Sequence, residues 1–207
     1  SLIADYIAQY NNWIFDDALS YSGFECLMGI LGYSVQIYCD FSGYTDIAIG
    51  CARIMGIRLM QNFNHPYMAT SIKEFWNRWH ISLSTWFRDY LYFPLGGSRC
   101  ILPRVILNTW IVFLLSGLWH GAAWNFVVWG VYHGVGLVIE RAGFKNVVGR
   151  LPRPFANLYL MLFVIIGWVF FRAPDLSYAV GYLCNMFGGA EAAFTSFIPA
   201  IDFAVLN

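Results

Sequence analysis

The sequence predicts an all-α, polytopic transmembrane protein with short or broken helices, and two observations lead to that prediction. Hydrophobic residues make up 59% of the 207 residues and charged residues only 12%, whereas a soluble domain carries about 25% charged residues. Several apolar stretches also approach the roughly 20 residues that a helix needs to cross a bilayer. A soluble protein of this composition would have too little polar surface, so we expect lipid to be its main solvent.

The predicted spans are apolar stretches of unequal length, at residues 24–39, 47–57, 105–118, 122–139, 155–171 and 192–206. The second follows the first closely and is separated from it by Asp40, Gly43 and Asp46. The stretch at 105–118 would be only about 21 Å long at 1.5 Å per residue, against a hydrocarbon core of about 30 Å. We therefore expect the turn at 119–122 to lie in or near the membrane interior, facing protein or a water-filled cavity.

The basic residues are unevenly distributed and predict an orientation. Residues 1–52 contain no Lys or Arg, residues 53–104 contain seven, and Arg141, Lys145, Arg150 and Arg153 form a second cluster. By the positive-inside rule both clusters are cytoplasmic, which places the turn at 119–122 toward the opposite face. Whether residues 47–57 span the membrane decides only the side of the N-terminal end.

Residues 71–93 are predicted to form one amphipathic helix at the membrane interface. Ser71 and Glu74 have the spacing of a capping box, and Pro94 with the glycines that follow it would stop the helix. Aromatic and apolar residues recur at helical spacing on one face: Trp76, Trp79, Leu83, Trp86 and Tyr90. Polar residues form a second face: Lys73, Asn77, His80, Ser84 and Arg88.

Several classes of site are disfavoured by the sequence. The five cysteines are odd in number and include no C-x-x-C pair, so neither a disulfide framework nor a metal site is predicted. Phosphate-binding glycine motifs are absent, and no basic stretch lacks surrounding apolar sequence, so we expect no nucleic-acid partner. The start and end of the sequence suggest an internal piece of a longer protein. We expect residues 1–207 to form a single, incomplete transmembrane domain.

His120 is the first candidate for chemistry. It follows Ser116, Gly117 and Trp119, and Trp124 comes shortly after it. An ionisable side chain within a membrane is costly and is a functional candidate for that reason, and a neutral imidazole can accept a proton near neutral pH. The small residues would let other groups approach, and the two indoles would wall the site. The alternative is a histidine that is hydrogen-bonded for packing.

Two more histidines and two carboxylates are weaker candidates. His80 lies on the polar face with Asn77 one turn before it, where a solvated surface is the alternative. His133 lies within a predicted span, where an interhelical hydrogen bond is equally compatible with the sequence. Asp40 and Asp46 could bind a cation, although pairing with Arg53 is the favoured interpretation.

Three ordered motifs resemble the membrane-bound O-acyltransferase (MBOAT) family. They are residues 38–46 (YCDFSGYTD), 75–92 (FWNRWHISLSTWFRDYLY) and 115–121 (LSGLWHG). The chain is most similar to the bacterial alginate O-acetyltransferase subgroup, with teichoic acid D-alanyl transferases as more distant relatives. The resemblance implies a helical fold around a central tunnel, the family's near-invariant histidine at His120, and its second polar position at His80.

The resemblance also implies a reaction and its participants. A multi-pass protein of the bacterial inner membrane would take acetyl from a cytoplasmic thioester such as acetyl-CoA, with no bound cofactor, and transfer it to hydroxyls of an exopolysaccharide such as alginate. His120 would be the general base, and His80 with Asn77 would position the acyl group or polarise its carbonyl. Direct transfer and an acyl-enzyme both stay open. A periplasmic, SGNH-like acetyltransferase partner and membrane lipids are the expected partners.

Two alternatives belong to other functional classes. Ionisable residues in broken helices also suit a transporter or channel, which should show repeat symmetry or a polar chain along one span; neither is found in the sequence. The chain could also be an anchoring subunit of a complex that modifies surface polysaccharide. Loss of transfer with intact assembly in a His120→Ala variant would exclude that role.

Overall fold

The computed structural model describes residues 2–188, so the predicted span at 192–206 lies outside the described residues. All regular structure in the described part is helical, as predicted. The described residues divide into two compact units: unit 1 contains residues 2–41, 121–129 and 165–188, and unit 2 contains 42–120 and 130–164. Three helices take part in both units, namely α2 (Gly23–Ile54), α6 (Trp124–Ile139) and α8 (Arg153–Arg172).

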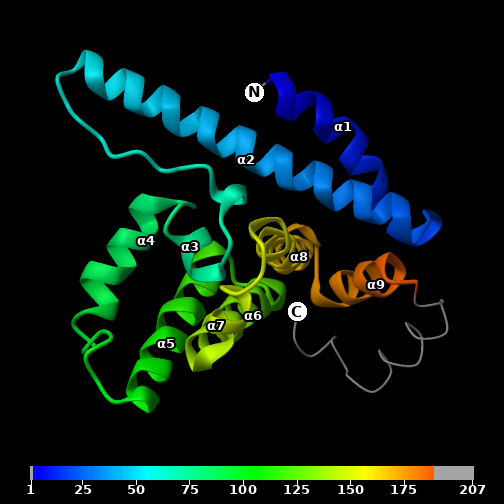
Figure 1. Ribbon diagram of the computed structural model, residues 1–207. Coiled ribbons are helices and arrows are strands. Elements are labelled where there is room, and N and C mark those ends of the chain that lie inside the picture. Colours follow the sequence, from blue (N-terminus) through cyan, green and yellow to red (C-terminus); the bar gives the residue numbers. More distant parts are fainter. Residues whose placement is uncertain (1, 189–207) are drawn as a thin grey trace. The chain divides into compact units, whose positions relative to one another are not determined.

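Unit 1 is held together by aromatic side chains that bond to backbone carbonyls. It also contains α1 (Leu2–Asp16), η1 (Ala18–Ser20) and α9 (Leu176–Met186). The helix α1 lies along the first part of α2 (Figure 1), where the rings of Phe15 and Tyr33 are 5.9 Å apart. Tyr182 of α9 stacks on Phe15 at 4.6 Å and donates a 2.6 Å hydrogen bond to the carbonyl of Cys26. Because these bonds satisfy buried polar groups, α9 is fixed to the chain near η1.

Unit 2 contains the predicted motifs at 75–92 and 115–120. Its further elements are η2 (Pro66–Met68), α3 (Ile72–Trp76), α4 (Ile81–Phe87), η3 (Arg88–Tyr92), α5 (Leu102–His120), η4 (Glu140–Phe144) and α7 (Lys145–Val148). Both η3 and η4 are π-helical turns, which occur often at functional sites.

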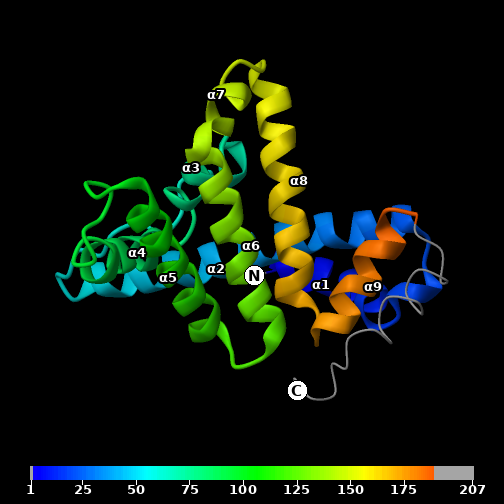
Figure 2. The ribbon, with the colours of Figure 1, turned by 90° about the horizontal axis from the view of Figure 1, so that it is seen from below.

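Small residues on α6 allow its neighbours to approach closely. A Cβ atom at Gly130 would lie 2.3 Å from the carbonyl oxygen of Phe113 on α5, and one at Gly134 would touch Trp110. The pair has the G-x-x-x-G spacing that lets membrane helices pack tightly. On the other side, where α6 runs beside the start of α8 (Figure 2), Tyr132 stacks on Phe163 at 4.3 Å. These contacts fix α5, α6 and the start of α8 in unit 2.

The first two predicted spans are one helix, so the predicted break between them is wrong. The helix α2 runs without interruption through Asp40, Gly43 and Asp46. Aspartate and glycine each cost under about 1 kcal/mol in a helix interior, which is too little to end a long helix that contains no proline. Both carboxylate side chains lie on the surface of the described chain, so neither disturbs the packing of the helix.

The other predicted spans correspond to α5, α6 and α8. Two described helices are long and apolar enough to cross a membrane, α5 and α8; a larger number of spans stays a prediction. The helix α5 is longer than predicted, and its 19 residues extend about 28 Å. Since the hydrocarbon core is about 30 Å thick, His120 would lie near the far boundary, not deep in the interior.

The predicted helix over residues 71–93 is also wrong as a single element. It is divided into α3, α4 and η3, with residues 77–80 between the first two. Its aromatic residues do not share a face, since Trp79 is buried whereas Trp86 and Tyr90 are exposed. The division follows from His80, whose φ of 44° is incompatible with a right-handed helix.

Candidate active site

His120 is the last residue of α5, where the helix ends and the chain turns toward α6. Its side chain is half-buried, whereas the neighbouring Trp119 indole is 60% exposed. The two rings meet edge to face with centroids 4.8 Å apart. The imidazole is therefore covered by an aromatic wall on one side and still accessible.

His80 occupies a strained position directly before α4. Its φ of 44° and ψ of 55° lie in the left-handed region, which costs about 1–2 kcal/mol for a residue with a side chain. His65 is the other non-glycine residue with positive φ in the described chain. Strain of this kind persists only where neighbouring contacts impose it and often marks functional sites.

Asn62 supplies the contacts that impose the His80 conformation. Its backbone carbonyl accepts from the Ile81 N–H at 3.0 Å. Its side-chain oxygen accepts from the Ser82 N–H at 3.0 Å and from the Ser82 hydroxyl at 2.7 Å. Asn62 thus binds the first N–H groups of α4, which would otherwise lack partners. We did not predict this residue, because nothing in the sequence near Asn62 indicates contact with residues 81–82.

Trp119 connects the two candidate histidines. The centroids of the His80 and Trp119 rings are 6.5 Å apart. Burial, together with a smaller effect of the nearby His120, lowers the pKa of His80 to about 4. At neutral pH His80 is therefore an uncharged imidazole, which can offer one N–H and accept one hydrogen bond. The structure brings His80, Trp119 and His120 into one cluster.

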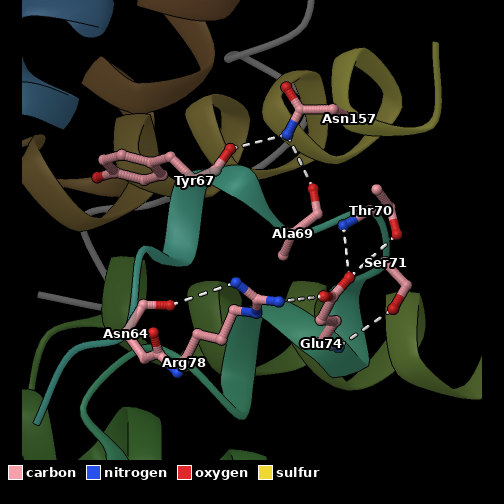
Figure 3. A network of polar contacts seen from close by, with 8 residues as sticks. All are labelled: Asn64, Tyr67, Ala69, Thr70, Ser71, Glu74, Arg78 and Asn157. Atoms are coloured by element: carbon pink, nitrogen blue, oxygen red, sulfur yellow. Dashed lines mark hydrogen bonds and ion pairs between the residues drawn. The ribbon is translucent and has the colours of Figure 1, made fainter. Parts of the chain in front are cut away.

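The chain before His80 is fixed by a polar network around α3 (Figure 3). Ser71 caps α3 by accepting from the Glu74 N–H at 3.1 Å, which confirms that half of the predicted capping box. The Glu74 carboxylate accepts from the Thr70 N–H at 2.7 Å and pairs with Arg78 at 2.7 Å, instead of reaching the Ser71 N–H. Asn157 of α8 donates to the carbonyls of Tyr67 and Ala69, at 2.7 and 2.8 Å.

Glu140 anchors the start of α3 from a distant part of the chain. Its buried carboxylate accepts from the N–H groups of Ile72 at 2.8 Å and Lys73 at 3.2 Å, and from the Tyr159 hydroxyl at 3.4 Å. A carboxylate at the N-terminus of a helix accepts hydrogen bonds from the free backbone N–H groups there, and these bonds are charge-assisted. The sequence analysis also missed Glu140, and only its position directly after a long apolar stretch could have drawn attention to it.

His133 lies in an aromatic enclosure and is 2% exposed. Its ring is 5.0 Å from Trp76, 5.3 Å from Phe163 and 6.4 Å from Phe113. His133 belongs to α6, and the rings around it come from α5 (Phe113), α8 (Phe163) and the C-terminal end of α3 (Trp76). The contacts therefore favour packing over substrate binding as the role of His133.

The remaining candidates are more scattered. Ser116 is buried on α5, one helical turn before His120, and Asn77 is exposed at the C-terminal end of α3. Asp46 and Arg53 are two helical turns apart on α2, about 10 Å along the axis, and no ion pair between them is recorded in the described residues. Asp40 is exposed on α2, and Trp124 begins α6 in unit 1 with 43% exposure.

No metal site is found in the part of the chain that the structure describes: residues 2–188 contain no group of three His, Cys, Asp or Glu side chains that could hold an ion. The His80–His120 cluster itself contains two imidazoles and an indole. This set can move a proton and donate hydrogen bonds to an oxygen atom.

The family model of the membrane-bound O-acyltransferases matches residues 2–180. The chain belongs to this family. It is 48% identical over 79% of its length to a probable alginate O-acetylase of Azotobacter vinelandii, and 44% identical over 90% of its length to a peptidoglycan O-acetyltransferase of Helicobacter pylori. A teichoic acid D-alanyltransferase of Bacillus subtilis is 42% identical over 53% of this chain. The chain spans about a third of the length of these relatives: the matched region covers 33%, 36% and 29% of their respective sequences.

Proposed function

We propose that this chain is the catalytic part of a bacterial membrane O-acetyltransferase that modifies a cell-surface polysaccharide. The observation that supports it best is the cluster of His80, Trp119 and His120 in a chain of this family. Relatives named for alginate and peptidoglycan acetylation support acetyl as the group and a polysaccharide as the acceptor. The proposal includes a cytoplasmic thioester such as acetyl-CoA as donor and a multi-pass arrangement in the inner membrane.

In the proposed reaction His120 is the general base. It takes the proton of the acceptor hydroxyl while the hydroxyl oxygen attacks the thioester carbonyl carbon, forming the new C–O bond. The C–S bond then breaks, and the proton passes to the departing thiolate. A thiolate is a good leaving group because the pKa of its conjugate thiol is about 8.5, so little acid assistance is needed. General base catalysis of this kind contributes about 10²–10⁴-fold.

His80 would act without changing its charge. Since burial keeps the pKa of this imidazole at about 4, its N–H can donate a hydrogen bond to the carbonyl oxygen as negative charge develops there. The fixed turn at residues 78–82 would hold that N–H in place before the substrate arrives, and Asn77 would help to position the acyl group. A periplasmic acetyltransferase partner would receive the acetyl group or deliver it to the polymer.

The test is O-acetylation by the full-length protein and its His120→Ala variant in membranes supplied with acetyl-CoA labelled in the acetyl group. We expect incorporation into polysaccharide to fall at least about 100-fold in the variant, with normal amounts in the membrane and normal assembly with partners. His65→Gly is the control, because it removes a histidine that lies outside the cluster, at a position where positive φ suits glycine. Normal acetylation by the His120→Ala protein would contradict the proposal, and so would equal loss in both variants.

A further inference from the structure

A cavity of about 460 Å³ lies in unit 2, away from the histidine cluster. One wall is the start of α3 with Thr70, Ser71 and Glu74. The other is the segment from α7 to the first residue of α8 (residues 145–153, called the α7–α8 connection), which carries Lys145 and Arg153. Val148, Leu151 and Ala156 add apolar surface. The cavity thus combines two cationic side chains and two hydroxyl groups with an apolar base.

The charges in this cavity are unequally compensated. Glu74 is engaged by Arg78 and Thr70, and these bonds outweigh the opposing effect of burial and lower the pKa of its carboxyl. Lys145 and Arg153 are exposed, and no ion pair to either is recorded in the described residues. The pocket therefore presents two available cations beside a carboxylate that is already neutralised, which favours an anionic ligand.

The wall formed by α3 is rigid and carries a hydroxyl that can donate. Ser71 Oγ accepts from the Glu74 N–H (Figure 3), so its hydrogen can point to another acceptor. The backbone before it is held by the two bonds from Asn157, and the backbone after it by Glu140. A ligand would therefore meet a preformed surface, which lowers the entropic cost of binding.

The position of the cavity indicates what the anion is. Arg153 is the first residue of α8, one of the two helices in residues 2–188 that are long and apolar enough to cross a membrane. Lys145 and Arg153 also belong to the basic cluster that the positive-inside rule assigns to the cytoplasmic face. The exposed apolar side chains of Val147 and Leu151 lie in the same connection. Cations beside apolar surface at the end of a spanning helix match the two-part chemistry of a phospholipid.

We propose that this cavity binds the phosphate of an anionic phospholipid headgroup at the cytoplasmic surface of the membrane. Lys145 and Arg153 contact the phosphate, the Ser71 hydroxyl donates to one of its oxygens, and Leu151 lies against the upper part of the acyl chains. The bound lipid would join α3 to the α7–α8 connection. This inference is independent of acyl transfer, because binding can be measured without turnover.

The test uses the full-length protein in nanodiscs of phosphatidylcholine with increasing phosphatidylglycerol, and native mass spectrometry to count retained lipids. Lys145→Gln and Arg153→Gln should each weaken retention of phosphatidylglycerol about fivefold, and together about 30-fold. Retention of phosphatidylcholine should not change. Arg99→Gln is the matched control, since it removes an exposed cation that does not line the cavity, and we expect a change of less than about twofold.

Coenzyme A separates the lipid from a soluble phosphate ester of the same chemistry. If the lipid assignment is right, millimolar coenzyme A leaves the retained phosphatidylglycerol unchanged. Displacement by coenzyme A, with a parallel loss of its affinity in both variants, would assign the pocket to a soluble ligand and overturn the proposal. Equal loss in the Arg99→Gln control would also overturn it. Lys145→Arg and Arg153→Lys, which keep the charge, should retain the lipid even if a glutamine variant folds poorly.

Discussion

The two ends of the segment at residues 70–80 are built in opposite ways. At its start, Ser71 and Glu140 accept hydrogen bonds from the free N–H groups of Ile72, Lys73 and Glu74 in α3. At its end, His80 has a costly left-handed backbone and lies half-buried near His120. An anchor whose backbone N–H groups are all hydrogen-bonded can therefore hold a strained residue in place. Here α3, with its packed Trp76, connects the anchor to His80.

Replacing His80 tests the strained end and has the largest expected effect. In His80→Gly the backbone keeps its conformation without penalty, since glycine adopts positive φ readily, but the imidazole is lost. We expect acetyl transfer to fall about 10²–10³-fold, as for removal of one donor to a developing oxyanion, with a thermal midpoint equal to or above that of the parent protein.

His65→Gly again serves as the control, because it relieves the same type of strain outside the cluster and should leave the rate of transfer unchanged. If His80→Gly transfers acetyl normally, the left-handed turn is structural and the comparison between the two ends fails.

Glu140→Ala tests the anchored end. Two backbone N–H groups of α3 would lose their acceptor, and leaving buried donors unsatisfied costs about 1–3 kcal/mol. The free energy of unfolding of the full-length protein in detergent should fall by about 2 kcal/mol. Glu140→Gln keeps one carbonyl acceptor, so its free energy of unfolding should fall by roughly half as much as that of Glu140→Ala. Equal stability of all three proteins would show that the anchor is dispensable.

Acid provides a third test, because the pKa of His80 is about 4 when folded and about 6.5 when unfolded. Between these values the unfolded chain binds more protons, so stability rises with pH. The contribution of His80 is complete above pH 6.5 and is lost as the pH falls toward 4. His80→Asn should reduce the loss of unfolding free energy over this window by about 1 kcal/mol, after allowance for partial exposure. If the free energy of unfolding depends on pH in the same way in the parent protein and in His80→Asn, His80 is not the group with the lowered pKa.

Asn62→Ala shows whether the strain at His80 is imposed locally, and its expected effect on the rate is smaller than that of His80→Gly. The variant removes the side-chain acceptor for the Ser82 N–H and hydroxyl, as in the loss of a helix cap, which costs about 1 kcal/mol. Because His80 would then relax, we expect transfer to fall about tenfold through kcat with little change in KM. Asn62→Asp keeps the acceptor and should restore most of the rate.

The parts of this structure that were predictable are those set by local sequence. Hydrophobic length located α5, α6 and α8, and the spacing of Ser71 and Glu74 located the start of α3. Motif resemblance selected His80, Trp119 and His120, which the structure brings together. The uninterrupted course of α2 was mispredicted because polar residues were read as breaks, although their cost in an exposed helix is small.

What sequence reasoning could not find depends on contacts between distant residues. The break at His80 is imposed by Asn62, 18 residues earlier, and α3 is anchored by Glu140, 68 residues after Ile72. Neither partner has a local pattern, since one asparagine in a loop and one glutamate after an apolar stretch are ordinary features. Such pairings follow from how the helices pack, which hydropathy and spacing do not specify.

The bond between Ile72 and Glu140 also sets an order of events during synthesis. Ile72 leaves the ribosome long before Glu140 does, and all of α5 and α6 is made in between. The start of α3 therefore lacks its acceptor until both of those helices have emerged. A truncated product that ends between His120 and Glu140 contains His80 and His120 but not the anchor for the segment that carries His80. Nascent chains of this kind should expose that segment to proteases in the cell, and the segment should become resistant only after the rest of unit 2 has been added.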